Sequence, residues 1–159
     1  MNIALEVVVA LGPIAMLRYT LRACEIWQND NFLSLESVAR GEGKRCRVSA
    51  SGTSENVIVE SSMAARAVLA PEAIPLTHWN VLCLERPLFS PQEGTPIASC
   101  FEAQYEEMVL LADGRKVRAT RYSLLLKPIL YNWYDRGGVW TSLSAEGSDG
   151  SIIRYCRVE

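Results

Sequence analysis

Short runs of β-favouring residues, separated by turn residues, recur along most of this chain and restrict it to a small set of folds. Over residues 17–27, apolar side chains alternate with Arg18, Thr20 and Arg22, which is the period of a half-buried strand. Similar runs cover residues 32–38, 44–50 and 56–60, with turn residues between them. Many short strands with regularly spaced turns are typical of an all-β sandwich or barrel.

The same pattern returns in the second half of the chain. Asp113-Gly114 separates two such runs, which is a hairpin signal. The runs here cover residues 101–111, 115–126, 129–134, 139–144 and 151–158. We therefore predict an antiparallel meander of about nine or ten strands, curled into a barrel or half-barrel because twist accumulates from strand to strand.

The start and the middle of the chain are less regular. Residues 1–17 predict a strand, a turn at Gly12-Pro13 and a second strand. Residues 62–70 fit either a short helix or a short strand, and five prolines over residues 71–96 favour loops and short edge strands. With 159 residues, the chain is expected to form a single all-β domain, residues 1–159.

Charge and cysteine usage limit the surroundings in which the chain works. Sixteen basic and 18 acidic residues give a net charge of −2, which argues against a nucleic-acid partner. No basic residue precedes Arg18 and Glu6 interrupts the apolar run, so we expect neither an export signal nor a membrane span. The five cysteines are widely spaced and predict free core thiols in a reducing cytoplasm.

The sequence lacks the residues that several common metal-binding and catalytic sites require. His78 is the only histidine, so a multi-histidine metal site is excluded and no metal or cofactor is expected. All four aspartates lie in predicted turns, where the side chain caps the local backbone. The segment from Gly41 to Arg45 lacks parts of a phosphate loop and is interpreted as a turn. His78 itself is interpreted as a hydrogen-bonded residue at the start of a strand, with catalysis alongside a cysteine as the alternative.

Aromatic and arginine side chains are the remaining features of the sequence that indicate a binding site. The four tryptophans lie near predicted strand ends, where they fit either a core or the mouth of a barrel. The arginines of the strands either face water or converge on a carboxylate. Glu25 is in phase with the inward-facing residues of its run and needs a partner, for which Arg121 or Tyr122 is a candidate. The candidate ligand-binding residues are Trp27, Trp79, Trp133, Tyr134, Glu25, Arg121 and Tyr122.

An ordered set of short motifs extends this interpretation. They are Glu25-Ile26-Trp27, Phe32-Leu33, Trp79-Asn80, residues 119–122, Trp133-Tyr134-Asp135 and Asp149-Gly150. From residue 17 onward they resemble an uncharacterised bacterial family of small, mostly exported all-β proteins of unknown function, with E-x-W near the front and W-Y-D near the end. The resemblance implies a β-barrel or half-barrel and brings no catalytic residues. The chain departs from it in lacking an export signal and the family's first strand, which would leave an open sheet edge.

Together these observations favour a protein that binds rather than one that catalyses. We expect it to hold a peptide by strand addition at an open edge, or an apolar or acidic small ligand in the mouth of the sheet. Such a protein would present its ligand to partner enzymes of a biosynthetic pathway. One alternative is a cofactor-free isomerase or cyclase that uses Glu25, Tyr122 or His78 as acid or base. Another is a structural homodimer that is joined through edge strands and has no ligand.

Overall fold

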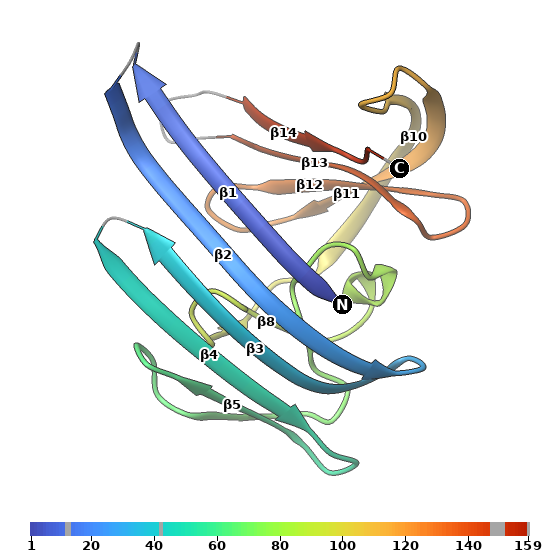
Figure 1. Cartoon of the computed structure of the whole chain (residues 1–159). Helices are drawn as coiled ribbons and strands as arrows, with labels where there is room; N and C mark the ends of the chain where they lie inside the picture. The colour runs from blue at the N-terminus through green and yellow to red at the C-terminus, as the bar shows by residue number, and fades with distance from the viewer. Residues whose placement is uncertain (12–13, 42, 147–151, 159) are drawn as a thin grey trace. The chain divides into compact units, whose positions relative to one another are not determined.

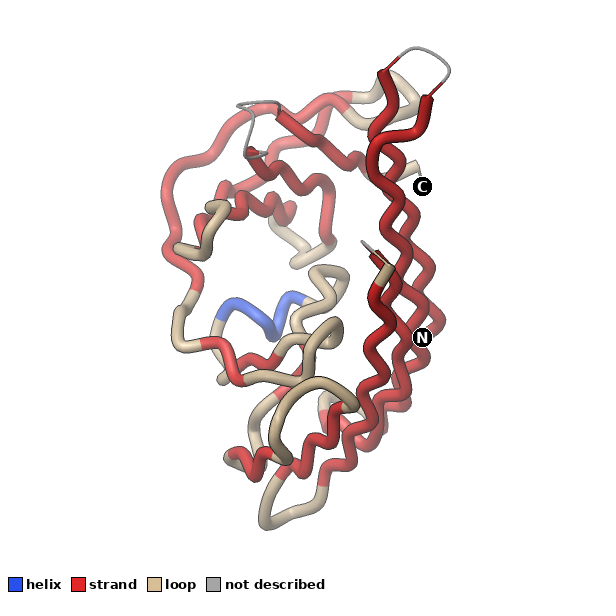
Figure 2. The backbone as a smooth tube through the Cα atoms, turned by 90° about the vertical axis from the view of Figure 1, so that its left-hand side faces the viewer, coloured by secondary structure: helices blue, strands red, loops and turns tan. Residues whose placement is uncertain are grey.

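The computed structural model describes residues 1–11, 14–41, 43–146 and 152–158. These residues form strands and turns, and their helical residues are confined to one short 3₁₀ helix, drawn in blue in Figure 2. The chain forms two compact units. The first contains Met1–Leu76 and Pro87–Ile97, and the second contains Thr77–Arg86 and Ala98–Glu159.

The first unit is built on a six-stranded antiparallel sheet whose strands follow one another in chain order (Figure 1). Its strands are β1 (Asn2–Leu11), β2 (Ile14–Gln28), β3 (Asn31–Gly41), β4 (Lys44–Gly52), β5 (Val57–Ser61) and β6 (Ala67–Leu69). A small second sheet contains β7 (Ile74–Pro75), β8 (Leu88–Phe89) and β9 (Pro96–Ile97). Each strand of the six-stranded sheet pairs antiparallel with the next strand along the chain, so strand register sets which residues lie side by side.

Alternation gives this sheet one apolar and one polar face. Leu21, Leu35 and Val48 are buried on one side, and each such side chain contributes about 1.5–3 kcal/mol when it leaves water. The small sheet packs on that side, where the rings of Phe32 and Phe89 meet edge to face at 5.9 Å. The opposite face holds the exposed arginines of β2, β3 and β4.

The second unit is a five-stranded antiparallel sheet with one 3₁₀ helix against it. Its elements are η1 (Val81–Leu84), β10 (Phe101–Leu110), β11 (Lys116–Leu124), β12 (Leu130–Asp135), β13 (Trp140–Glu146) and β14 (Ile152–Cys156). Asn80 caps η1, because its Oδ1 accepts a hydrogen bond from Leu82 N at 3.0 Å. Cys83 of η1 is 2% exposed, which anchors the helix on the sheet.

The all-β prediction is confirmed, but the strands do not form one continuous meander. The described residues contain three sheets, none of which closes into a barrel, and β7 and β8 pair in parallel. The 14 strands of this described part exceed the predicted nine or ten because β6 and three strands of two residues each in the proline-rich segment add to them. Of residues 62–70, only Ala67–Leu69 is regular, and it is a strand.

Most predicted strands and turns coincide with those of the structure. β1 and the start of β2 match the two strands predicted around residue 12. The predicted turns at residues 12–13 and 147–150 lie outside the described residues. No helix in the described part of the chain has the length and apolar character that crossing a bilayer requires.

Candidate functional site

The buried Glu25 and the half-buried Trp27 form a hydrogen-bonded pair in the first unit. Glu25 is 1% exposed, and its Oε2 accepts a hydrogen bond from Trp27 Nε1 at 2.8 Å. The Trp27 ring meets Phe32 edge to face at 5.5 Å. The inward direction predicted for Glu25 is therefore confirmed. Trp27, which accounts for one oxygen of Glu25, is a residue of the same strand. The predicted partners Arg121 and Tyr122 belong to the second unit.

In the second unit, Arg121 lies in a stack of aromatic rings. Its guanidinium carbon is 3.9 Å from the centre of the Tyr131 ring, 5.5 Å from Tyr105 and 5.6 Å from Trp133. Trp133 is 5% exposed, and its Nε1 donates to Glu107 Oε1 at 2.8 Å. A guanidinium over aromatic faces is favourable, so this arrangement holds β10, β11 and β12 together.

Tyr122 and Tyr134 lie together, next in sequence to Arg121 and Trp133. Their rings meet edge to face at 6.0 Å. The Tyr134 hydroxyl donates to the His78 carbonyl and is 3.1 Å from Cys83 Sγ. Burial raises the pKa of Tyr134 well above its ordinary value and raises that of Cys83 to about 11.

His78 lies beside this buried group, in the loop before η1 and not at the start of a strand as predicted. Its backbone has a φ of 62°, a left-handed conformation that is uncommon outside glycine. Burial lowers the pKa of His78 to about 4, and a hydrogen bond with the Asn132 side chain opposes this shift. The imidazole is therefore neutral at pH 7.

The structure thus divides the candidate residues into groups. Arg121 and Trp133 lie together, as do Tyr122 and Tyr134. Trp79 precedes η1 in the second unit and is half-buried. Trp27 and Glu25 lie in the first unit. Of the three residues of the acid–base alternative, Glu25 belongs to one unit and Tyr122 and His78 to the other.

Two smaller predictions can also be compared with the structure. Asp113 and Asp135 cap turns, because their Oδ1 atoms accept hydrogen bonds from Arg115 N and from Gly137 N and Val139 N. Cys46 and Cys83 are buried thiols as predicted, but Cys24, on the polar face of β2, and Cys100 are exposed, and Cys156 is half-buried. Asp149 lies outside the described residues.

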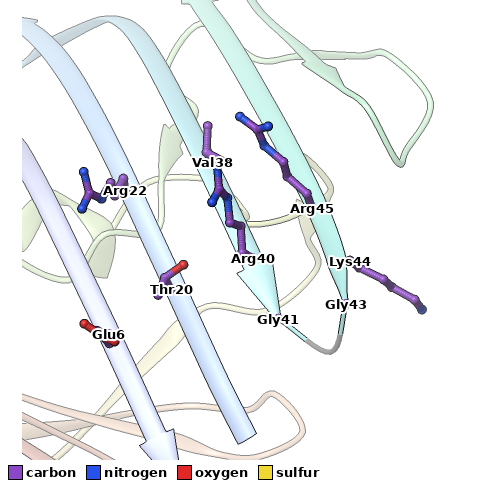
Figure 3. Close-up of a pocket in the computed structure, with 9 residues that line it drawn as sticks. All are labelled: Glu6, Thr20, Arg22, Val38, Arg40, Gly41, Gly43, Lys44 and Arg45. Atoms are coloured by element: carbon purple, nitrogen blue, oxygen red, sulfur yellow. The ribbon is translucent and has the colours of Figure 1, made fainter.

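The polar face of the six-stranded sheet carries a hollow of about 1000 Å³ (Figure 3). Its described lining comes from β1, β2, β3 and β4 and from the turn between the last two. The lining residues are Glu6, Thr20, Arg22, Val38, Arg40, Gly41, Gly43, Lys44 and Arg45. We call this feature the arginine hollow. Figure 3 shows Arg22, Arg40 and Arg45 over the strands, whereas Lys44 points away from them.

Strand register places like charges side by side in the arginine hollow. Arg40 on β3 lies directly opposite Arg45 on β4, a pairing that is unfavourable for like charges. Repulsion by Arg47, with burial and Arg40 adding to it, lowers the pKa of Arg45. Among the described residues, no ion pair neutralises Arg22, Arg40, Arg45 or Arg47.

The short connection between β3, which ends at Gly41, and β4, which begins at Lys44, produces this opposition. Gly43 has a φ of 73°, which glycine adopts without strain, and Gly41 pairs with Lys44. An added Cβ on Gly41 would lie 2.8 Å from the Tyr19 ring. The turn predicted from Gly41 to Arg45 is confirmed at Gly43, whereas Gly41 ends β3 and Lys44 and Arg45 begin β4. Arg40, which is not among the predicted site residues, could have been found from its place directly before this turn.

These features define the chain as an all-β protein with an arginine-lined hollow on one face of an open sheet. The chain belongs to the family described as "Domain of unknown function (DUF6134)", whose model matches residues 1–158. That match begins earlier than residue 17, where the motif resemblance begins. No curated protein and no solved structure matches the chain.

Proposed function

We propose that this protein is a non-catalytic binding protein and that it holds an acidic ligand in the arginine hollow. The observation that carries the proposal is the pairing of Arg40 with Arg45 across β3 and β4. Two cations directly opposite each other destabilise a sheet. An anion between them converts that repulsion into two charge-assisted hydrogen bonds, and guanidinium groups suit carboxylate and phosphate oxygens in particular.

Binding fits the described lining better than catalysis does. The hollow offers one carboxylate, Glu6, and one hydroxyl, Thr20, among its described residues. Glu6 lies on β1, two strands away from Arg40, and Thr20 lies on β2 directly opposite Arg40. A general acid or base must reach the proton that it transfers, and the arginines keep their protons at neutral pH. Because cationic side chains dominate the described lining, an acidic ligand is favoured over an apolar one.

A thermal-unfolding titration with citrate at constant ionic strength tests the proposal. Citrate should raise the melting temperature of the native chain, because a ligand that binds only the folded state stabilises it by mass action. The double variant Arg40→Gln/Arg45→Gln should lose most of this rise. Arg118→Gln, which removes another exposed arginine, from the second unit, is the matched control and should keep it. An equal rise in the double variant would show that citrate acts elsewhere.

The reducing cytoplasm remains our proposal for the compartment. Cys24 and Cys100 are exposed free thiols, and exposed thiols tend to be oxidised outside reducing compartments. Trapping thiols with N-ethylmaleimide during cell lysis should modify both cysteines. Recovery of either one in a disulfide would contradict this placement.

A further inference from the structure

We infer that the arginine hollow is built for a small ligand with two anionic groups about 7 Å apart, the distance between every second residue along a strand. This inference rests on the proposed function and adds the ligand's chemical class. It follows from the positions that strand register gives to the arginines, which form two adjacent rows across the sheet.

The first row runs across the sheet next to the β3–β4 turn. Glu6 pairs with Thr20, Thr20 with Arg40, and Arg40 with Arg45. Arg40 and Arg45 are cross-strand neighbours, whose Cβ atoms lie about 5 Å apart. Both guanidinium groups can therefore reach the same carboxylate or phosphate, which forms the first anion position.

The second row lies two residues further from the turn on each strand. Arg22 pairs with Val38, and Val38 with Arg47. Arg22 lines the hollow, whereas Arg47 lies beside it and is not one of its lining residues. The two arginines flank Val38 from positions about 10 Å apart, two strand spacings, and the length of their side chains allows both to reach over Val38. This pair forms the second anion position. Val38 supplies an apolar floor for the part of the ligand between the two acidic groups.

Among the side chains that the structure describes, the cationic area of β3 and β4 ends after these two rows, which limits the length of the ligand. In the row beyond Arg22 and Arg47, Glu36 pairs with Cys24 and with Ser49, and Ser49 pairs with Glu60. On the other side, the strands end at the turn between Gly41 and Lys44. A long polyanion that continued along the strands would meet carboxylates, so the arrangement favours a compact dianion over a nucleic acid or a polyphosphate.

A series of straight-chain dicarboxylates tests this spacing directly. Calorimetric titrations of the native chain with malonate, adipate, pimelate and sebacate at constant ionic strength would be compared with hexanoate, which has one carboxylate. Adipate or pimelate, whose extended chains best match the row spacing, should bind at least about tenfold more tightly than malonate or hexanoate, since a second charge-assisted contact is worth at least that factor. Sebacate should bind more weakly than the best chain length.

Single variants separate the two positions. Arg22→Gln and Arg47→Gln, made separately, should reduce adipate binding to the level of hexanoate and leave hexanoate binding within about twofold. Arg40→Gln should weaken both ligands, and Arg118→Gln should change neither. All four arginines are exposed, so circular dichroism should show an unchanged fold.

The outcomes distinguish the inference from the function on which it rests. If hexanoate and every dicarboxylate bind with affinities that follow net charge alone, the hollow is an anion site, but the two-position inference is wrong. That inference is equally wrong if Arg22→Gln and Arg47→Gln leave the preference for adipate intact. If no carboxylate binds the native chain, the proposed function fails together with the inference.

Discussion

His78 shows how one buried side chain links stability to pH. Its pKa falls from an ordinary value of 6.5 to about 4 on folding, because burial disfavours the imidazolium and the Asn132 hydrogen bond compensates only in part. Between these two values, the unfolded chain binds a proton that the folded chain does not bind. The free energy of unfolding therefore decreases as the pH falls from 6.5 toward 4.

We predict that His78→Asn removes this part of the acid sensitivity. Asparagine tolerates the left-handed backbone of this position and does not titrate. Between pH 7 and 4, the variant should lose less unfolding free energy than the native chain, by up to about 3 kcal/mol. Urea unfolding at pH 7, 5.5 and 4 measures the difference. Parallel pH profiles for the two proteins would contradict the neutral, buried imidazole.

The cysteines should differ sharply in reactivity. Burial raises the pKa of Cys83 to about 11, so at pH 8 only about one in a thousand of these groups is a thiolate, the reactive form. Cys24 and Cys100 are exposed. Brief iodoacetamide treatment followed by peptide mass spectrometry should label Cys24 and Cys100 long before Cys83 and Cys46. All five should react in urea, and early labelling of Cys83 would show that η1 detaches readily from its sheet.

At the scale of elements, the β3–β4 hairpin combines an unstrained glycine in its turn with an unfavourable side-chain pair. Gly43 provides the positive φ that the turn requires, while Arg40 and Arg45 repel each other across the strands. A sheet tolerates such a cost where the charges serve another purpose. The hairpin is therefore the element in which stability and ligand binding should oppose each other.

Arg40→Glu tests this opposition. The new carboxylate faces Arg45, so the melting temperature without ligand should rise at low salt, and the gain should shrink as salt screens the pair. The same variant should no longer be stabilised by citrate. Differential scanning calorimetry in low and high sodium chloride measures both effects. A lower melting temperature at low salt would mean that Arg40 already has a favourable partner in the native chain.

At the scale of the whole molecule, neither unit is a continuous piece of chain. The segment Thr77–Arg86 belongs to the second unit, and the chain then returns to the first unit with Pro87–Ile97. The 3₁₀ helix η1 lies in that early segment, and Cys83 meets Tyr134 of β12. The five-stranded sheet therefore depends on a segment that is separated from it in the sequence.

We predict that a fragment of residues 98–159 is less ordered than one of residues 77–159. Without η1, the fragment exposes the buried Tyr134, which is 2% exposed in the whole chain. Amide hydrogen exchange should be faster in β11 and β12 of the shorter fragment. Equal protection in the two fragments would show that the sheet folds without η1. The full-length chain provides the reference protection.

Local patterns explain why much of the fold could be predicted. The alternation in β2 places Leu21 and Ala23 inward and Arg22 outward, as the sequence indicates. Asp113 and Asp135 cap turns because their side chains reach only nearby backbone groups. The pairing of strands that are not joined by a hairpin could not be predicted from such local patterns. Two-residue strands such as β7 and β8 carry no periodic signal, so the third sheet was not predicted.

The candidate site, like the fold, was predictable from the sequence only in part. The sequence by itself determined an all-β chain, the inward direction of Glu25 and the turn after Gly41, because each depends on residues close together in the chain. Only the tertiary structure decided that Trp133 packs with Arg121 and that Arg22, Arg40 and Arg45 share one face. A net charge of −2 gave no sign of that face. The physical reason is that strand register sets which charges meet across neighbouring strands, whereas composition averages those charges over the whole chain.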